Sequence, residues 1–325
     1  MFFFIILYLQ VVNCLQLPKF WHKVSKPFKS KARNWFIGRA ETLGIPWTDL
    51  KENYMKPSVY DKLEYNKQDL EDTTIQYPLY YTQPFHGYDT GNLNWLAAQE
   101  AEAATLNIAA GYWPDIDPIV AQSWLRNNIT AITKNYMNIP IVDLEFSNIW
   151  NYTKTYNILD VGCSIGYSTE FFQDSFPHSN VYGVDLSPYF LSVAKYRSDL
   201  YERNITYIHG NAEYFHSEEK FRIICCNFLF HELPKNVALN ILNNLYNMIE
   251  PNGIIVIADI EPEVLKYDEN NLLTPFRKWM FEITEPHIFS YYESDMKTLL
   301  ENVGFKKIEK KRNDPVNSVW TGIKI

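Results

Sequence analysis

The sequence predicts an α/β protein in which a mostly parallel sheet, covered by helices on both faces, follows a helical cap. From about residue 155, short runs rich in Ile, Val and Tyr alternate with amphipathic stretches. Strands that alternate with helices at this spacing form a parallel sheet. The last segment breaks the alternation, since a helix ending near Gly304 is followed by two strand-like runs joined by Asn313-Asp314-Pro315. We therefore expect seven strands, the last two forming an antiparallel hairpin at the sheet edge.

The individual elements follow from composition and periodicity. Pro188 and Pro234 stand at helix starts, where a missing N–H costs little. Asn252-Gly253 is expected to form the turn into the fifth strand. The expected strands are 156–162, 180–186, 205–211, 222–230 and 253–260, and the expected helices are 167–176, 188–202 and 234–250.

Three regions are expected along the 325 residues. Residues 1–40 form a leader, residues 41–150 a cap region, and residues 151–325 the α/β domain. Within the cap, the segments 92–111 and 118–136 have helical character, and an irregular aromatic stretch (77–92) precedes them. The aromatic side chains there are suited to wall an apolar acceptor pocket or to pack between cap and body.

The leader combines two targeting signals. Residues 2–12 are an apolar run that is too short to cross a bilayer but has the length of a signal-peptide core. The basic, acid-free segment that follows resembles a transit peptide. Together they predict import into a plastid, with the secretory pathway or a membrane anchor as alternatives. No stable membrane span is expected in the mature protein.

Charge and cysteine content narrow the function. The formal net charge is −8, and residues 1–40 hold seven Lys and Arg and no acid, so the remainder has 23 basic and 38 acidic residues. Such an acidic body has no general attraction for nucleic acid. The adjacent Cys225 and Cys226 point to opposite faces of a strand and are badly placed to bridge. We expect no metal site, because the chain has no C-x-x-C motif.

The glycine loop 162–166 has two interpretations. Gly162-Cys163-Ser164-Ile165-Gly166 fits the G-x-S-x-G nucleophile elbow, and Asp259 and His287 follow in hydrolase order. However, the loop follows the first expected strand, and no upstream oxyanion loop is present. The second strand ends in Asp185, 19 residues after Gly166. A carboxylate at that position holds ribose hydroxyls in nucleoside-binding folds, so a cofactor-binding loop is favoured and the hydrolase remains the alternative.

The loop favours S-adenosylmethionine (SAM) over a dinucleotide. A dinucleotide fold uses G-x-G-x-x-G, whereas this chain has Asp160 before the first glycine and no third glycine. A pyrophosphate needs a bare helix N-terminus. SAM carries an amine and a sulfonium cation instead of a phosphate, so an acidic residue in the loop is useful.

Six segments resemble, in order and spacing, the motifs of class I SAM-dependent methyltransferases of the type 11 group. They are ILDVGCSIGYST, VYGVDLSPYFLSVAKYR, HGNAEYF, CNFLFHELP, MIEPNGIIVIAD and LLENVGF, within residues 155–325. Residues 77–105 resemble the N-terminal extension of a branch in cyanobacteria and plastid-bearing eukaryotes. The resemblance implies a seven-stranded Rossmann-like sheet and methyl transfer from SAM.

The resemblance also implies roles for individual residues. Gly162, Cys163 and Gly166 would contact the methionine moiety, with Asp160 toward its amine. Asp185 would hold the ribose hydroxyls. Leu186, Asn211 and Ala212 would surround adenine, and Asn227 and Phe228 would line the methyl-transfer side, while the cap residues Tyr81, Gly87 and Tyr88 are candidate contacts.

His231 and Glu232 are the candidate catalytic residues, because they follow the fourth strand at the edge where ligands bind. A histidine is suited to act as general base for an alcohol acceptor, although His231 could instead serve a structural role in its loop. His86 and His287 are alternatives on the acceptor side. The fourth strand lacks the Asn/Asp-Pro-Pro-Tyr motif of enzymes that methylate DNA bases or glutamine.

We therefore expect a SAM-dependent methyltransferase acting by SN2 displacement on a small or lipid-like molecule. Its alternatives are the hydrolase and a catalytically silent SAM-binding protein.

Overall fold

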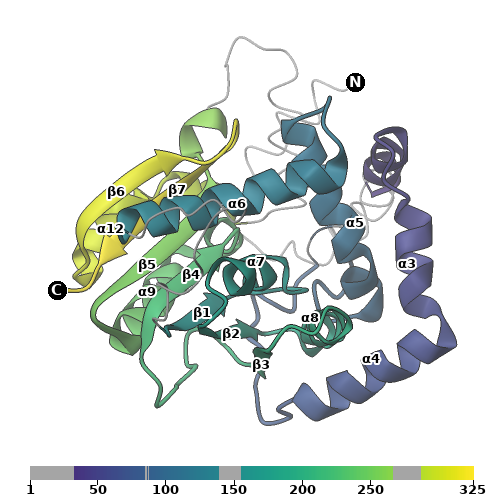
Figure 1. Cartoon of the computed structure of the whole chain (residues 1–325), viewed down its shortest axis with the longest axis horizontal. Coiled ribbons are helices and arrows are strands. Elements are labelled where there is room, and N and C mark those ends of the chain that lie inside the picture. Colours follow the sequence, from purple (N-terminus) through teal and green to yellow (C-terminus); the bar gives the residue numbers. More distant parts are fainter. Residues whose placement is uncertain (1–32, 85, 87, 139–154, 266–286) are drawn as a thin grey trace, which may run out of the picture.

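The computed structural model describes residues 33–84, 86, 88–138, 155–265 and 287–325, and its centre is a seven-stranded sheet (Figure 1). The strand order is β3-β2-β1-β4-β5-β7-β6. The first five strands run parallel, and β7 pairs antiparallel with both β5 and β6. The predicted parallel sheet with an antiparallel C-terminal hairpin is confirmed.

The strands lie close to their predicted positions. Their bounds are β1 Asn157–Val161, β2 Asn180–Asp185, β3 Ile205–His209, β4 Phe221–Asn227, β5 Ile249–Ile260, β6 Lys306–Arg312 and β7 Asn317–Ile323.

Two strand boundaries differ most from the prediction. β4 ends at Asn227, and the expected strand end 228–230 instead forms a bend and the start of a 3₁₀ helix. β5 begins at Ile249, four residues before the expected start at Gly253. Asn252 has a left-handed φ of 62°, and the pairing with β4 shifts register between Phe221 and Ile223. The Asn-Gly pair thus makes an irregularity within the strand, since the backbone regains pairing on both sides of it.

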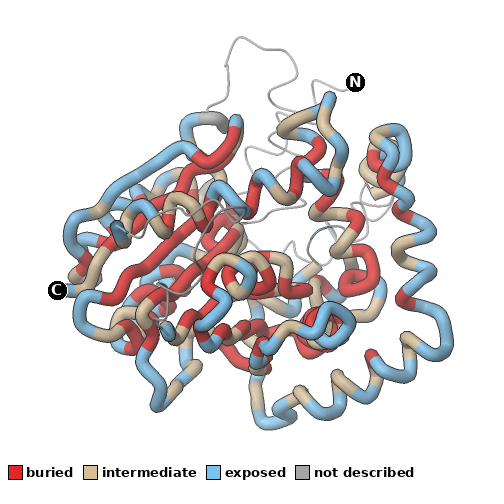
Figure 2. The backbone as a smooth tube through the Cα atoms, viewed as in Figure 1, coloured by how far each residue is buried: buried red, intermediate tan, exposed pale blue. Residues whose placement is uncertain are grey.

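Helices cover both faces of the sheet (Figures 1 and 2). On one face pack α9 (Lys235–Met248) and α12 (Met296–Val303), and on the other α7 (Tyr167–Ser175), α8 (Pro188–Leu200) and α6 (Pro118–Tyr136). Because β1, β4 and β5 are buried on both faces along most of their length, consecutive residues in them are largely apolar. Cys225 and Cys226 are buried and free within this core.

The cap consists of helices that surround the α7–α8 side of the body. The predicted helices are present as α5 (Trp95–Tyr112) and α6, which pack on each other. Two further helices, α3 (Trp47–Met55) and α4 (Pro57–Leu70), were not predicted. The α4 helix packs on α8, and α3 on α5, so the cap encloses one side of the sheet (Figure 1).

Residues 33–42 are helical and belong to the packed structure. Ala40, within the segment assigned to the leader, is fully buried against α5. Arg33 pairs with the buried Glu100, and Arg39 donates to the side-chain oxygen of Asn107 at 2.6 Å. Cleavage at residue 40 would remove these contacts. The apolar run 2–12 lies outside the described residues, and no helix within the described part of the chain is long and apolar enough to cross a membrane.

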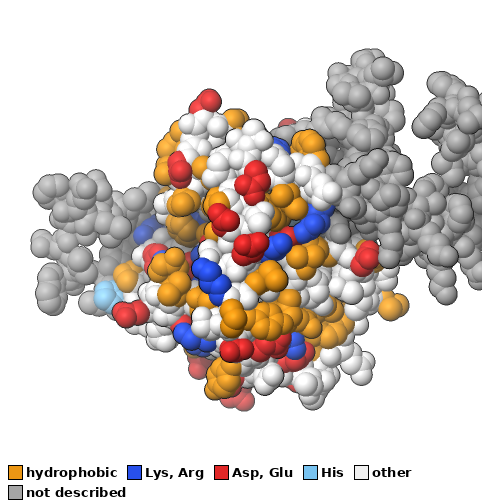
Figure 3. Space-filling model, turned by 90° about the vertical axis from the view of Figure 1, so that its right-hand side faces the viewer, with side chains coloured by type: hydrophobic (Ala, Val, Ile, Leu, Met, Phe, Trp, Pro, Cys, Tyr) orange, Lys and Arg blue, Asp and Glu red, His pale blue; other side chains and the backbone are white. Residues whose placement is uncertain are grey.

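The outer face of the cap is mixed in character. Figure 3 shows hydrophobic side chains interspersed with Lys, Arg, Asp and Glu on the side of the molecule where α3 and α4 lie. At the end of α4, Lys67 and Glu71 form an ion pair one helical turn apart, which contributes a few tenths of a kcal/mol. The stability of α4 therefore comes mainly from its packing on α8, with Leu63 fully buried.

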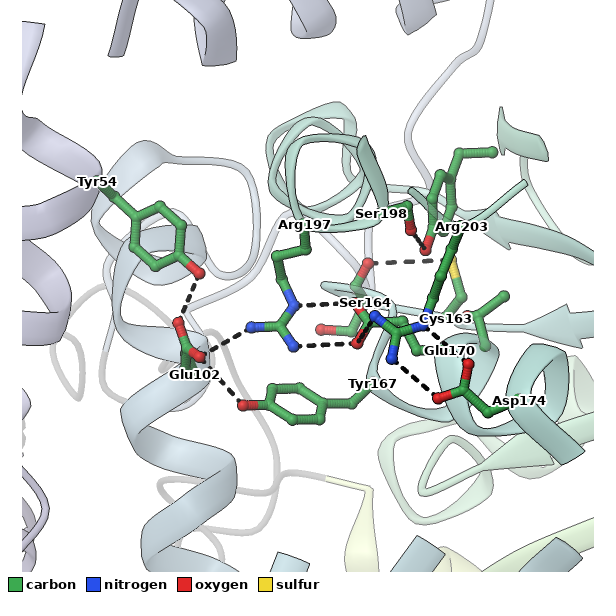
Figure 4. A network of polar contacts seen from close by, with 12 residues as sticks. Tyr54, Glu102, Cys163, Ser164, Tyr167, Glu170, Asp174, Arg197, Ser198 and Arg203 are labelled. Atoms are coloured by element: carbon green, nitrogen blue, oxygen red, sulfur yellow. Dashed lines mark hydrogen bonds and ion pairs between the residues drawn. The ribbon is translucent and has the colours of Figure 1, made fainter. Parts of the chain in front are cut away.

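A buried polar network joins cap and body (Figure 4). Arg197 on α8 donates to Glu102 on α5 at 2.8 Å and to both carboxylate oxygens of Glu170 on α7 at 3.1 and 3.2 Å. Glu102 also accepts hydrogen bonds from the Tyr54 and Tyr167 hydroxyls at 2.6 and 3.1 Å. Four helices thus converge on one guanidinium, because each buried charge needs a partner.

Loss of this guanidinium is expected to destabilise the protein strongly. Arg197→Met leaves Glu102 and Glu170 buried without their cation, so we expect the free energy of unfolding to fall by about 3 kcal/mol. Lys195→Met is the matched control, because Lys195 lies on the same helix in a partly exposed pair with Asp199; its effect should stay within about 0.5 kcal/mol. Urea unfolding of both variants measures the difference, and equal effects would contradict the proposed importance of the network.

Candidate active site

Three buried aspartates mark the carboxyl edge of the parallel strands. Asp160 lies at the end of β1, Asp185 ends β2, and Asp259 is next to last in β5. Their exposed fractions are 0%, 9% and 0%. Because the carboxyl ends of parallel strands meet at one edge, these three carboxylates define the region where a ligand of an α/β sheet binds.

The glycine loop after β1 is tied to β2 by its backbone. The N–H groups of Gly162 and Cys163 both donate to the Val184 carbonyl, at 2.8 and 3.1 Å, and the Ser164 N–H donates to Asp185 at 2.8 Å. Three consecutive amides are therefore used within the chain. A pyrophosphate cradle needs such amides free, so the loop is unsuited to a dinucleotide.

The two glycines of the loop occupy conformations that favour glycine. Gly162 and Gly166 have φ of 72° and 85°. A Cβ at Gly162 would lie 3.0 Å from the Leu229 side chain, and one at Gly166 would lie 2.5 Å from the Tyr207 hydroxyl. Leu229 belongs to the loop after β4, so the two loops touch. Cys163 is buried in the core, and burial raises the pKa of its thiol well above the ordinary value.

Asp185 is placed as a ribose-binding carboxylate would be. Besides Ser164, it accepts the Ser187 N–H at 2.8 Å. Burial raises its pKa to about 6, although the Ser187 and Ser164 amides act in the opposite direction. The Ser187 hydroxyl, in turn, donates to the Asn92 carbonyl of the cap at 2.7 Å, which brings the cap loop over this end of β2.

The predicted adenine-side residues cluster beyond Asp185. Leu186 and Asn211 are each 9% exposed, and the Leu186 carbonyl lies 3.1 Å from Nε2 of His209. The Asn211 side-chain oxygen accepts the Glu213 N–H at 2.9 Å, which fixes the turn that also carries Ala212. The sheet order places this cluster, between β2 and β3, at one end of the site.

Asp160, Asn227 and Phe228 lie at the other end, where β1 and β4 are neighbours. The Asp160 carboxylate accepts hydrogen bonds from Thr169 at 2.7 Å and from the Asn227 amide at 3.2 Å. Asp160 therefore orients Asn227 through contacts inside the chain, and burial raises the pKa of Asp160. Phe228 has a left-handed φ of 60°, a strained conformation for a residue other than glycine.

His231 and Asp259 form a hydrogen-bonded pair. His231 lies in the short 3₁₀ helix Phe230–Glu232 after β4, with Nδ1 2.7 Å from an Asp259 carboxylate oxygen. Asp259 also accepts the N–H groups of Phe230 and Ile260, at 2.9 and 2.8 Å. A carboxylate held in this way fixes the imidazole orientation and the tautomer that carries its proton on Nδ1. Nε2 of His231 is then the basic nitrogen.

Glu232 links this pair to two residues of the cap, His86 and Tyr81. Glu232 lies 4.0 Å from Nε2 of His231 and 3.5 Å from Nε2 of His86. The Tyr81 hydroxyl is buried, and its pKa is raised well above the ordinary value by burial and by the charges of Asp185 and Glu232. Tyr81 is therefore within electrostatic range of both Asp185, the candidate ribose-binding carboxylate, and Glu232. Tyr88 donates to Glu100 instead, and Gly87 lies outside the described residues.

The hydrolase triad is not assembled. Asp259 is hydrogen bonded to His231, and no contact joins it to His287 in the part of the chain that the structure describes. Ser164, with φ of 50°, serves through its N–H as a partner of Asp185. The alternative based on Ser164, Asp259 and His287 is therefore wrong, because the acid that would orient the catalytic histidine already orients another one.

The residues present fit SAM. Three of the buried polar atoms without a hydrogen-bond partner among the described residues belong to this region: the Tyr81 hydroxyl and the side-chain oxygens of Asn92 and Asn227. Such atoms are costly unless a ligand or water satisfies them. Acceptor oxygens and carboxylates suit a ligand with ribose hydroxyls and a cationic amine. Within the described ranges, no group of three His, Cys, Asp or Glu residues is arranged to hold a metal ion.

Two candidate site residues were missed or misassigned from the sequence. Asp259 was assigned to the hydrolase, although its place at the end of β5, the neighbour of β4, already puts it near His231. Arg126 was not singled out. It lies within the buried stripe of α6 that includes Gln122, Leu125 and Ile129, and a basic residue in such a stripe is the signal that could have revealed it.

The fold and the site together define a Rossmann-like domain that binds a nucleoside cofactor without a pyrophosphate. Residues 158–253 match the family model of a methyltransferase domain. The chain therefore contains a class I, SAM-dependent methyltransferase domain, as the sequence predicts.

The relatives with curated names share about a quarter of their residues with this chain over the aligned segments. A malonyl-[acyl-carrier protein] O-methyltransferase of Bacillus cereus is 27% identical over 36% of this chain and 42% of its own length. One from Ilyobacter polytropus is 26% identical over 43% of this chain and 53% of its own length. The chain thus spans about half the length of these relatives. Phosphoethanolamine N-methyltransferase 2 of Haemonchus contortus, solved with SAM, is 16% identical with a TM-score of 0.45, covering 61% and 52% of the two chains.

The raised pKa of Asp185 predicts pH-dependent cofactor binding. Only the carboxylate accepts two ribose hydroxyls, and below pH 6 the group is mostly protonated. We expect the affinity for S-adenosylhomocysteine to fall about ten-fold between pH 7.5 and pH 5, as calorimetric titration measures. Asp185→Asn should bind more weakly and lose most of this pH dependence. An equal pH dependence in the variant would assign the titration to another group, of which the nearby His209 is one.

Proposed function

We propose that this protein transfers a methyl group from SAM to an oxygen atom of a small-molecule acceptor bearing a hydroxyl group. The observation that carries the proposal is the His231–Asp259 pair, held at 2.7 Å at the carboxyl edge of β4 and β5. A hydroxyl is a poor nucleophile until its proton is removed, so an oriented base beside the methyl-transfer side is a functional requirement for this acceptor.

When bound, SAM supplies an electrophilic methyl group. His231 accepts the hydroxyl proton on Nε2, and Asp259 stabilises the imidazolium that results. Asp185 holds the ribose, and Asn227 and Phe228 line the reacting end. From the cap, the buried Tyr81 would help to keep water away from the reacting end.

The named relatives support oxygen as the atom methylated, since they are O-methyltransferases of a malonyl group on acyl-carrier protein. A carboxylate acceptor of that kind already has a nucleophilic oxygen and needs no base. The His231–Asp259 pair therefore favours a hydroxyl acceptor for this chain over a carboxylate.

The test separates cofactor binding from methyl transfer. SAM carrying a labelled methyl group is incubated with the full-length protein and a panel of small hydroxyl compounds, carboxylic acids and a malonyl thioester, and methylated products are detected by mass spectrometry. Labelled methyl ethers support the proposal. Labelled esters alone would overturn the hydroxyl assignment, and cofactor binding without any product would favour a silent SAM-binding protein.

Loss of the base is expected to reduce turnover and leave cofactor binding intact. For the hydroxyl acceptor found, His231→Ala should reduce kcat about 10²–10⁴-fold, while the affinity for S-adenosylhomocysteine stays within about two-fold. His216→Ala is the control, because His216 is exposed on the loop after β3. A His231→Ala variant that turns over normally would contradict the role of this histidine as base.

We also propose that residues 1–32 direct the chain to a plastid, supported by the apolar run 2–12 and the basic segment after it. The signal is assigned to end before Arg33, because Arg33 and Arg39 make contacts within the cap. A reporter fused to residues 1–32 is expected in plastids of a host with plastids. Retention in the cytosol would overturn the targeting proposal, and entry into the secretory pathway would support its alternative.

A further inference from the structure

Arg126 is a buried cation without an anion. It lies on α6 of the cap with an exposed fraction of 7%, and its Nε has no hydrogen-bond partner among the described residues. Its hydrogen bond goes to an uncharged group, from Nη1 to the Ser168 hydroxyl at 2.7 Å. No carboxylate in the described segments comes within ion-pair distance of it, which is unusual because buried charges are nearly always paired.

The groups around Arg126 do not compensate the cost of burying its positive charge. The guanidinium lies 4.9 Å from the centre of the Phe228 ring, a favourable contact that leaves its charge without an anion. Among the acids, Asp160 has the largest electrostatic effect on the Arg126 pKa. Its oxygens already accept hydrogen bonds from Thr169 and Asn227. Burial lowers the pKa of Arg126 to about 10. The free protein therefore keeps a cation in place at a cost in free energy.

The position of Arg126 matches one end of an extended nucleoside cofactor. Across the sheet order β3-β2-β1-β4, Asp185 marks the ribose at the end of β2, and Leu186 and Asn211 lie toward β3. The other end of the ligand must then cross β1 toward β4. Ser168, in the first turn of α7, and Phe228, after β4, flank that end, and Arg126 contacts both.

We propose that Arg126 binds the carboxylate of the methionine moiety of SAM, so that the cap helix α6 supplies part of the cofactor site. This inference rests on the proposed function. A guanidinium with an unused Nε–H offers a carboxylate two donors in a fork. The matched methyltransferase segment, 158–253, begins after α6. The cofactor thus joins the cap to the α/β domain through its charged end.

The experiment compares two ligands that differ at this end. S-adenosylhomocysteine carries the amino acid group, and 5′-methylthioadenosine lacks it. For Arg126→Met in the full-length protein we expect the Kd of S-adenosylhomocysteine to rise ten-fold or more, and that of methylthioadenosine to stay within two-fold. Arg126→Lys keeps the positive charge but loses the forked pair of donors, so its Kd for S-adenosylhomocysteine should lie between those of the wild type and Arg126→Met. Arg222→Met is the matched control, since Arg222 lies at the opposite end of β4 beside Glu250.

Thermal unfolding provides a second readout that a purely structural arginine would not give. Without ligand, Arg126→Met should melt at the wild-type temperature or above it, because an unpaired buried cation is replaced by an apolar chain. The stabilisation produced by S-adenosylhomocysteine should shrink in the same variant.

Three outcomes would overturn the inference. Unchanged affinity for S-adenosylhomocysteine would exclude the contact, and an equal loss for both ligands would make Arg126 a residue that only shapes the site. A wild-type protein that binds neither ligand would contradict the proposed function itself. In that case Asp185→Asn would also show no change, which distinguishes the two failures.

Discussion

The architecture of the site depends on burying three carboxylates at one edge of the sheet. A buried carboxylate must find donors, and Asp160, Asp185 and Asp259 find them largely in the segments that follow their own and neighbouring strands. Asp185 takes the amides of Ser164 and Ser187 and so fixes the loops after β1 and β2. Asp259 takes the Phe230 amide and the His231 imidazole and fixes the segment after β4. Loop geometry is thus a consequence of charge burial.

The cap is joined to this edge by two guanidinium groups in contrasting states. Arg197 is saturated, with Glu102 of the cap on one side and Glu170 of α7 on the other (Figure 4). Arg126 has no carboxylate within ion-pair distance among the described residues. A saturated pair stabilises a fixed arrangement, whereas an unpaired buried cation costs free energy until an anion arrives. The first is suited to holding the cap in place and the second to sensing the cofactor.

The sequence predicts the sheet well because the signals for its strands and helices depend on residues close together in the chain. These signals are the apolar runs, the prolines at helix starts and the glycine loops. The helices α3 and α4 were not predicted because they are mostly polar, and their stability comes from packing on α5 and α8. The His231–Asp259 pair was not predicted either, because it also depends on residues far apart in the chain. It joins residues 28 positions apart, and the order Ser, Asp, His along the chain favoured another partner for the same acid.

The motif Gly162-Cys163-Ser164-Ile165-Gly166 shows how the same residues can fit two chemistries. In a nucleophile elbow the serine hydroxyl is the functional atom and needs a histidine beside it. Here the functional atom of Ser164 is its amide nitrogen, which a left-handed φ of 50° directs at Asp185. The acid that a hydrolase would need belongs to His231. Here the Asp259 oxygens already accept from Phe230, His231 and Ile260. Ser164 contacts Asp185 through its amide, so neither Ser164 nor Asp259 takes the part that the hydrolase interpretation requires.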